Sequence, residues 1–181
     1  MNRYLHAAAG LAVATLLVHP ACGAVKDAAP NGFSVAESVH IAAPPDKVYA
    51  ELIQPSHWWS SEHTFSRSAS NLTLDARAGG CWCEALANGS VQHLAVVFAS
   101  PGKRLVMRGA LGPLQGLGVE GAMTIDLKPS DGGTDLTATY NVGGYLKDGL
   151  TSWADPVDRV LGEQFNRLKA DVETGSAETK P

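Results

Sequence analysis

The chain has fewer basic than acidic residues, and this shortage excludes two classes of partner. Lys and Arg total 14 against 18 Asp and Glu, which gives a formal net charge of −4. No segment concentrates positive charge, so the electrostatic signature of a protein that binds nucleic acid or anionic lipid is missing. We therefore expect no nucleic-acid partner.

The chain also lacks an apolar run long enough to cross a bilayer. Its most apolar stretch, Ala7 to Val18, is 12 residues long, against the ~20 that a transmembrane helix needs. A single positive charge at Arg3 precedes this stretch, and Pro20 and small residues ending in Ala24 follow it. This order is typical of a secretory signal peptide. We predict that residues 1–24 are a signal peptide cleaved near Ala24, that the protein is periplasmic or secreted, and that it has no stable membrane insertion afterwards.

Cysteine is scarce, with three in the whole chain. Cys22 could carry a lipid anchor, but the residues 19–21 before it resemble a lipoprotein signal poorly, so a soluble product is favoured. Cys81 and Cys83 are too few for a disulfide framework. Residues two apart on a regular strand have Cα atoms ~6.6–6.8 Å apart, at the far limit for a disulfide. We expect these two cysteines to be small apolar fillers.

The remaining composition is that of one globular domain, with 45% hydrophobic and 18% charged residues. We expect a linker at 25–32, one domain at 33–173 and a flexible polar tail at 174–181. Within the domain the pattern predicts a strand, a short helix, about six antiparallel strands and one long helix, an α+β arrangement. The long helix begins with Asp155 as N-cap and Pro156 in its first turn. Its apolar stripe consists of Val157, Val160, Leu161, Gln164, Leu168 and Val172.

The sequence predicts three hairpins that connect these strands. Asn88-Gly89 is a strong hairpin signal and, taken as a two-residue loop, pairs Leu86 with Val91, Glu84 with His93, and Trp82 with Ala95. The second hairpin turns at residues 100–102 and the third near residues 131–133. Because Pro101 cannot take a positive φ, we expect a loop longer than two residues there. That length turns Glu84 and His93 inward, because a one-residue slip moves every side chain to the other face.

Four potential ligand residues cluster in "GGCWCEALANGSVQHL", yet their spacing argues against a metal. On a strand Cys81 and Cys83 point to one face, whereas Glu84 and His93 point to the other. We therefore predict no metal site, and the sequence shows no cofactor motif. Glu84 and His93 are instead candidates for acid/base chemistry, with a cross-strand charge pair as the alternative.

The segments "SVHIAAPPDKVYAEL", "PGKRL" and "DGGTDLTATYNV" with the final helix resemble the START-like SRPBCC superfamily, in its polyketide-cyclase-like and heat-shock-ATPase-activator-like branch. The resemblance covers residue 33 to about residue 173. It implies a helix-grip fold, in which a curved antiparallel sheet of about six to seven strands wraps a long C-terminal helix. It also implies an apolar cavity between helix and sheet, but it fixes no activity.

Together these observations predict a protein that binds a small, largely apolar molecule in an internal cavity. The alternative is a cyclase- or dehydratase-type enzyme that uses Glu84 and His93, and a chaperone-partner module is a third hypothesis. The sequence does not determine the oligomeric state. The predicted ligand contacts are Trp59, His63, Trp82, Met107, Tyr140 and Gln164.

Overall fold

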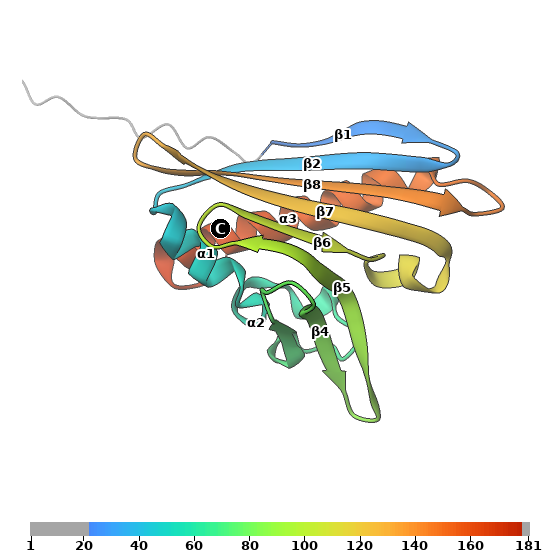
Figure 1. Ribbon diagram of the computed structural model, residues 1–181, viewed down its shortest axis with the longest axis horizontal. Coiled ribbons are helices and arrows are strands. Elements are labelled where there is room, and N and C mark those ends of the chain that lie inside the picture. Colours follow the sequence, from blue (N-terminus) through green and yellow to red (C-terminus); the bar gives the residue numbers. More distant parts are fainter. Residues whose placement is uncertain (1–21, 179–181) are drawn as a thin grey trace, which may run out of the picture.

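One curved antiparallel sheet and one long helix make up most of the fold. The structure is a computed structural model that describes residues 22–178. Within these residues eight strands form a single sheet in the order β1-β2-β8-β7-β6-β5-β4-β3, one more than the highest number expected. Figure 1 shows β4 and β5 bending away from the flatter part made by β2, β8 and β7. The strands are β1 (Cys22–Ala29), β2 (Gly32–Ile41), β3 (Leu72–Leu74), β4 (Cys81–Leu86), β5 (Gly89–Ser100), β6 (Arg104–Arg108), β7 (Gly118–Ser130) and β8 (Gly133–Tyr145).

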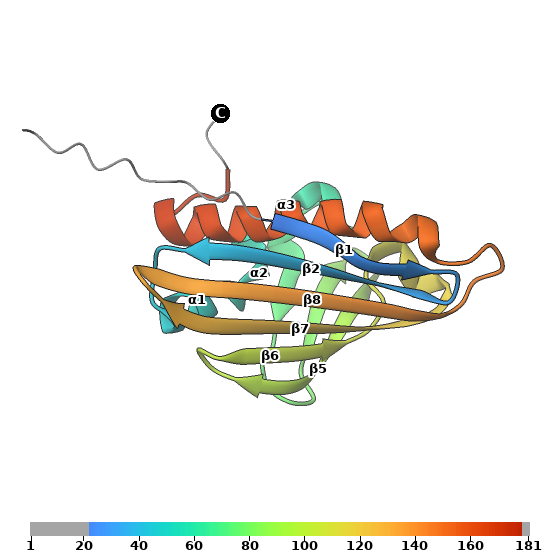
Figure 2. The same ribbon diagram turned by 90° about the horizontal axis from the view of Figure 1, so that it is seen from above.

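The long helix α3 (Ala154–Thr174) runs along the sheet and packs against β2 and β1 (Figures 1 and 2). It starts one residue before the predicted cap, so Asp155 lies in the first turn rather than at the N-cap. There its negative charge still interacts favourably with the helix dipole. The helix ends at Gly175, whose φ of 75° suits a residue without a Cβ. Among residues 22–178 no helix is both long and apolar enough to span a membrane.

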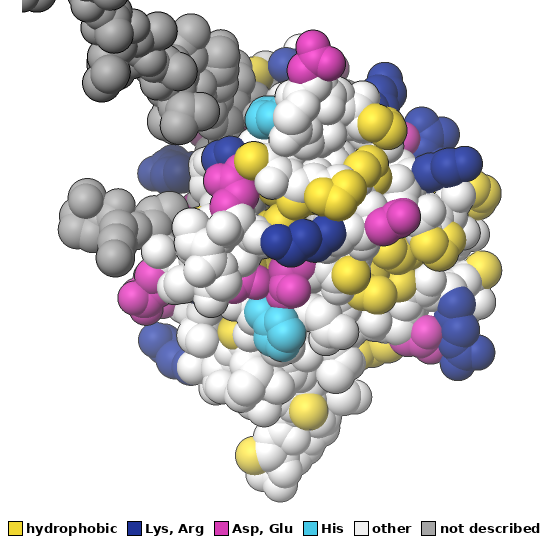
Figure 3. Space-filling model, turned by 90° about the vertical axis from the view of Figure 1, so that its left-hand side faces the viewer, with side chains coloured by type: hydrophobic (Ala, Val, Ile, Leu, Met, Phe, Trp, Pro, Cys, Tyr) yellow, Lys and Arg dark blue, Asp and Glu magenta, His cyan; other side chains and the backbone are white. Residues whose placement is uncertain are grey.

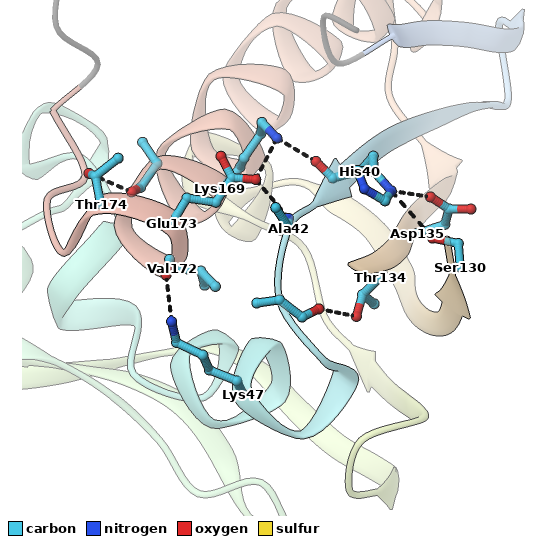
Figure 4. Close-up of polar contacts among 12 residues, drawn as sticks. His40, Ala42, Lys47, Ser130, Thr134, Asp135, Lys169, Val172, Glu173 and Thr174 are labelled. Atoms are coloured by element: carbon cyan, nitrogen blue, oxygen red, sulfur yellow. Dashed lines mark hydrogen bonds and ion pairs between the residues drawn. The ribbon is translucent and has the colours of Figure 1, made fainter. Parts of the chain in front are cut away.

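Polar contacts fix the C-terminal half of α3 to the corner between β2 and α1 (Pro45–Leu52), as Figure 4 shows. The Lys169 ammonium donates to the carbonyl of His40 at 2.6 Å and pairs with Glu173 at 2.7 Å. The Glu173 carboxylate in turn accepts from the amide of Ala42 at 2.8 Å. Lys47 of α1 donates to the carbonyl of Val172 at 3.0 Å. These bonds link three segments that are far apart in the sequence.

The core lies between the inner face of the sheet and the helices. The alternation in β2, β7 and β8 buries every second side chain there, as the sequence pattern predicts. A short helix, α2 (Pro55–Trp58), adds the fully buried Trp58. The largest fully buried side chains are Trp58, Tyr140, Phe165, Ile41, Leu52, Leu94, Leu105, Met107, Leu114, Met123, Ile125 and Leu136.

The N-terminal part differs from the predicted linker. Residues 25–29 belong to β1, which pairs with β2 through a tight turn at Pro30-Asn31. The Asn31-Gly32 pair, a hairpin signal, indicates this turn in the sequence. The predicted signal peptide lies mainly in residues 1–21, outside the described residues. At the other end, the structure describes residues 174–178 of the predicted flexible tail, and Ala177 among them is buried. Residues 179–181 lie outside the described range.

Two hairpins turn where the sequence indicates. Ser130 pairs with Gly133, which leaves Asp131-Gly132 as the loop between β7 and β8. Ser100 pairs with Arg104, so the loop between β5 and β6 has three residues and is longer than two, as expected. The first of the three hairpins, between β4 and β5, has a different register, and this difference determines the candidate site.

Candidate functional site

A cavity of about 410 Å³ lies between the N-terminal half of α3, the curved part of the sheet and two connecting segments. Most of its wall is aromatic or aliphatic, and four of the lining side chains are polar: Glu62, His63, Thr64 and His93. The walls come from residues 59–65 before β3, residues 111–114 after β6, and residues 153–161 around the start of α3. The lining residues are Trp59, Glu62, His63, Thr64, Phe65, Leu72, Trp82, His93, Leu111, Gly112, Pro113, Leu114, Trp153, Pro156, Val157, Val160 and Leu161.

Glu84 of β4 is held by three donors at the edge of this cavity. Its side chain is 1% exposed. One carboxylate oxygen accepts from the amide of Phe65 at 3.1 Å and from Nε2 of His93 at 2.9 Å. The other oxygen accepts from the amide of Ser66. Because all these bonds favour the charged form, Glu84 is an anchored carboxylate and not a free acid in the cavity.

His93 reaches Glu84 because it occupies a β-bulge. Cys83 pairs with Gln92 and Trp82 pairs with Leu94, so His93 is the extra residue of β5. The predicted pairing of Glu84 with His93 is therefore wrong in register, since Glu84 lies opposite Val91 and the loop is Ala87-Asn88. The buried face specifies a register more strongly than the turn does. The predicted inward orientation is confirmed, because both side chains are buried and bonded to each other.

The electrostatics assign a proton to one particular nitrogen of His93. Burial alone would raise the pKa of Glu84, but the donors of Ser66, Phe65 and His93 together lower it. Burial lowers the pKa of His93, against the opposing influence of Glu84. A neutral imidazole beside an ionised carboxylate donates from Nε2, which leaves Nδ1 as an acceptor. No group within residues 22–178 bonds to that Nδ1, and the ring lines the cavity.

Three other predicted contacts also line the cavity: Trp59, His63 and Trp82. The two indole rings meet edge-to-face with centroids 4.8 Å apart. Trp59 donates its indole N–H to the carbonyl of His63 at 3.0 Å, which fixes the turn between them. At the rim, His63 approaches Glu163 of α3 at 3.3 Å.

The remaining predicted contacts lie outside the cavity lining: Met107, Tyr140 and Gln164. The Tyr140 hydroxyl donates to the carbonyl of Gly109 at 3.0 Å and accepts from the amide of Leu111 at 2.9 Å. Burial raises the pKa of Tyr140 to about 12, so this hydroxyl stays protonated. The Gln164 side-chain oxygen accepts from the amide of Ser60 at 2.7 Å. In the structure these residues contact other parts of the protein. That they also contact a ligand stays a prediction.

The expectation of two free thiols is wrong: Cys81 and Cys83 form a disulfide. Their Cα atoms are 5.5 Å apart, closer than the ~6.6–6.8 Å of a regular strand. The strand departs from regular geometry at this point, because the bulge falls between Trp82 and Cys83. The argument from ideal strand spacing therefore did not apply.

One group of possible metal ligands lies away from the cavity, on the helices. Glu51, His57 and Asp171 bring one potential ligand atom each within 4.8 Å of one another. Figure 3 shows the end of the molecule on which histidine side chains lie beside acidic ones at the surface. Burial and then the neighbouring Glu51 carboxyl raise the pKa of Asp171. His57 is exposed and bonds to Glu51 at 2.7 Å, and such surface groups are common without an ion, so this group gives no ground for a metal.

Sequence reasoning missed the part of the wall contributed by residues 111–114 and by Trp153. The segment "LGPLQGLG" has no periodicity, and only the tertiary structure brings it opposite α3. The sequence predicted the apolar stripe of α3, but it did not show which part of the stripe lines the cavity and which part packs in the core. Val157, Val160 and Leu161 line the cavity, whereas Leu168 and Val172 pack in the core farther along the helix.

Comparisons with known proteins agree on the fold. The structure of protein EF2215 from Enterococcus faecalis aligns with a TM-score of 0.58 at 15% identity, covering 88% of this chain and 80% of that one. CalU16 from Micromonospora echinospora gives 0.54 at 15% identity, with coverage of 89% and 86%. The Aha1 dimer from Colwellia psychrerythraea gives 0.54 at 15% identity, with coverage of 78% and 97%.

A search of curated proteins gives no significant match. Residues 32–173 match the family model described as polyketide cyclase / dehydrase and lipid transport. That segment contains every strand except β1, both short helices and nearly all of α3. The chain therefore belongs to the polyketide cyclase / dehydrase and lipid transport family, in the SRPBCC polyketide-cyclase-like branch, and has its helix-grip fold.

Proposed function

We propose that this protein binds a small, largely apolar molecule in the cavity beside α3. The observation that carries the proposal is the wall itself, which combines a mostly apolar lining with a few polar side chains, among them His93. A volume of about 410 Å³ lies within the range of small-molecule sites. The family description supports the same kind of function.

The orientation of the ligand follows from the same wall. Its apolar body lies against aliphatic lining residues such as Leu111, Leu114 and Val160. A hydroxyl or amide N–H on the ligand donates to Nδ1 of His93, which otherwise has no partner among the described residues. Because Glu84 is buried behind the cavity lining and held by three donors, it acts on the ligand through His93.

We also propose that the protein is exported. The N-terminal sequence supports this proposal, because its charged, apolar and small-residue segments follow the order of a signal peptide. An oxidising compartment also suits the disulfide between Cys81 and Cys83. The ligand would then be a molecule of the periplasm or the cell exterior.

Native mass spectrometry of the mature protein from its own host tests the binding proposal. We expect a small apolar molecule that recurs in each preparation and is released on denaturation. When this molecule is added back to the empty protein, the fluorescence of the three tryptophans in the cavity wall should change: Trp59, Trp82 and Trp153. Val160→Phe fills the cavity from α3 and should abolish retention. Val106→Phe, a half-buried site on β6 outside the lining, is the matched control and should retain the ligand.

An empty protein that stays empty after exposure to host lipid extract would contradict the proposal. So would a companion that survives in Val160→Phe but is lost in Val106→Phe, because the ligand would then occupy another site. Retention in both variants would place the ligand outside this cavity as well.

A second candidate function is acid/base catalysis in the same cavity, and one observation favours it. The neutral His93, with its proton directed to an anchored carboxylate, has the arrangement of a general base. Here the reacting base is His93, and Glu84 holds the ring and stabilises its protonated form. Under this hypothesis His93→Gln keeps ligand retention but removes turnover of the identified ligand, whereas unchanged turnover would refute it.

A further inference from the structure

The disulfide lies on the opposite face of β4 from the cavity. Trp82, between the two cysteines, points into the cavity, so alternation along the strand places Cys81 and Cys83 on the outer face. Both cysteines are partly exposed. A small thiol can therefore reach the disulfide without entering the cavity.

The disulfide shortens β4 at the residues that face the bulge in β5. The Cα atoms of Cys81 and Cys83 are 5.5 Å apart, about 1 Å less than in a regular strand. Directly opposite, the three residues Gln92, His93 and Leu94 span the two residues Trp82 and Cys83. A contracted strand beside a strand with one extra residue is the geometry of a bulge, and it lets the extra residue point to a new direction.

The neighbouring strand shows that the bulge is constrained from its other side as well. A Cβ on Gly109, which directly follows β6, would lie 2.6 Å from the carbonyl oxygen of His93. The φ of Gly109 is 145°, a conformation that residues with side chains rarely adopt. The backbone of His93 is thus enclosed by a glycine on one side and by the disulfide-bridged strand on the other.

Glu84 directly follows Cys83 on β4, but its carboxylate is also held from outside the two strands of the bulge. The amides of Phe65 and Ser66 hold its carboxylate, and both belong to the segment before β3. A change at the disulfide therefore acts on His93 through the bulge, whereas the carboxylate of Glu84 has two bonds to the segment before β3 that the bulge does not supply. The bond between His93 and Glu84 is the contact that such a change would break.

We propose that the Cys81–Cys83 disulfide is a redox-controlled positioning element for His93. In the oxidised protein it maintains the contraction of β4, the bulge, and the contact of His93 with Glu84 and the cavity. Reduction lets β4 lengthen, so that the bulge relaxes and His93 leaves Glu84. An effect of this movement on ligand binding rests on the proposed function, whereas the movement of His93 itself does not.

The chemical step is a thiol–disulfide exchange with a dithiol reductant. A thiolate of the reductant attacks one Sγ, which breaks the Cys81–Cys83 bond and forms a mixed disulfide. That attack releases the other Sγ as a thiolate, and the second thiolate of the reductant then attacks the reductant's own sulfur in the mixed disulfide and releases the first Sγ. Two electrons and two protons pass to the cysteines, and the reductant leaves as a cyclic disulfide.

Nuclear magnetic resonance of ring-labelled histidine tests the proposal without any ligand. We would compare the oxidised protein, the protein reduced with dithiothreitol, and the double variant Cys81→Ser/Cys83→Ser. In the two forms without the disulfide we expect loss of the hydrogen-bonded Nε2–H signal of His93. We also expect its pKa to rise toward that of a free histidine, since burial is the main cause of the lowered value.

Internal controls are present in the same spectra. His40 bonds to Asp135 and His57 bonds to Glu51, both far from β4 in the sequence, and their signals should not move. Dithiothreitol added to the double variant should change nothing. Signals of His93 that are identical in all three forms would overturn the proposal. Global unfolding on reduction would overturn it too, because the disulfide would then stabilise the whole fold and not one contact.

The histidine spectra test the redox proposal separately from the proposed function, which is tested by ligand retention. An oxidised protein that retains no ligand refutes binding but leaves the histidine spectra interpretable. If binding and the redox effect both hold, reduction should also weaken retention of the small companion in the wild-type chain and leave the double variant unaffected.

Discussion

Glu84 shows how one buried side chain organises the cavity wall. Its carboxylate gathers donors from two segments, the stretch before β3 and the bulge of β5. A glutamine side chain has the same shape but only one acceptor oxygen. Its amide nitrogen would face either the N–H groups of Phe65 and His93 or the N–H group of Ser66. Glu84 therefore acts through its charge as much as through its shape.

Glu84→Gln should lower the free energy of unfolding by ~1–3 kcal/mol, because either amide orientation leaves a buried donor without a partner. It should also lower the pKa of His93 further, since the negative charge of Glu84 raises it. Denaturant titration and histidine resonances measure the two effects. Glu163→Gln, which alters the rim pair with His63, is the control and should change stability by less than about 0.5 kcal/mol.

A second buried acid, Glu37, lies on β2 and is unrelated to the cavity. It is 0% exposed, and neither carboxylate oxygen has a hydrogen-bond partner of good geometry among the described residues. Gly23 of β1 and Gly162 of α3 lie against it, where a Cβ would crowd the carboxylate. Burial first, and then the neighbouring Asp158, raise the pKa of Glu37 to about 7, while Lys26 lowers it.

The protein should therefore lose stability as the pH rises from about 4.5 to 7. In this window the unfolded chain ionises Glu37 while the folded chain keeps the proton, so unfolding releases protons and becomes easier as pH increases. The accumulated loss is on the order of 3 kcal/mol. Glu37→Gln should flatten the profile and be more stable than the wild type at pH 8. Glu120→Gln, at an exposed site on β7, should keep the wild-type slope; a slope unchanged by Glu37→Gln would refute the assignment.

At the scale of elements, the bulge in β5 depends on the end of β6. Gly109 combines a φ of 145° with close approach to the carbonyl of His93. Any side chain there must either strain its own backbone or displace the bulge. This glycine links the turn after β6 to the direction of His93.

Gly109→Ala should destabilise the fold by about 1–3 kcal/mol through backbone strain and the contact with His93. Thermal or denaturant unfolding measures the loss. Gly116→Ala is the matched control, because its Cβ would meet nothing within 4 Å and its φ is not positive. Equal effects of the two substitutions would show that the bulge does not need a glycine beside it.

At the scale of the whole molecule, β1 connects the predicted export signal to the fold. Cleavage after Ala24 would leave residues 25–29 paired with β2. A chain that begins at Val25 lacks the pairing of residues 22–24 with residues 36–38 and should unfold at a slightly lower temperature than one that begins at Cys22. A chain that begins at Pro30 loses the strand and should melt at least about 5 °C lower.

The mass of the protein recovered from its own host tests export directly. We expect a mature chain that begins at Val25, found outside the cytoplasm. An uncleaved chain in the cytoplasm would contradict the prediction and would restore the chaperone-partner hypothesis that export otherwise disfavours.

The sequence determined the elements and their faces, because these depend on residues close together in the chain. Alternation in β7 and β8, the proline before α1 and the stripe on α3 each reflect local geometry. The same alternation placed Trp82 and Glu84 on one face of β4, opposite to Cys81 and Cys83. The resemblance to the family, confirmed over residues 32–173, then placed the cavity between helix and sheet.

Only the tertiary structure decided which residues form the site. The exact partner of His93 depends on a bulge, which shifts the register by one residue and has no local signal as clear as a turn. The disulfide depends on that same departure from regular strand geometry. The cavity wall joins residues 59–65, 111–114 and 153–161, whose proximity results from the curvature of the sheet and the packing of α3. Such long-range contacts arise from the combined packing of many residues, so no short stretch of sequence specifies them.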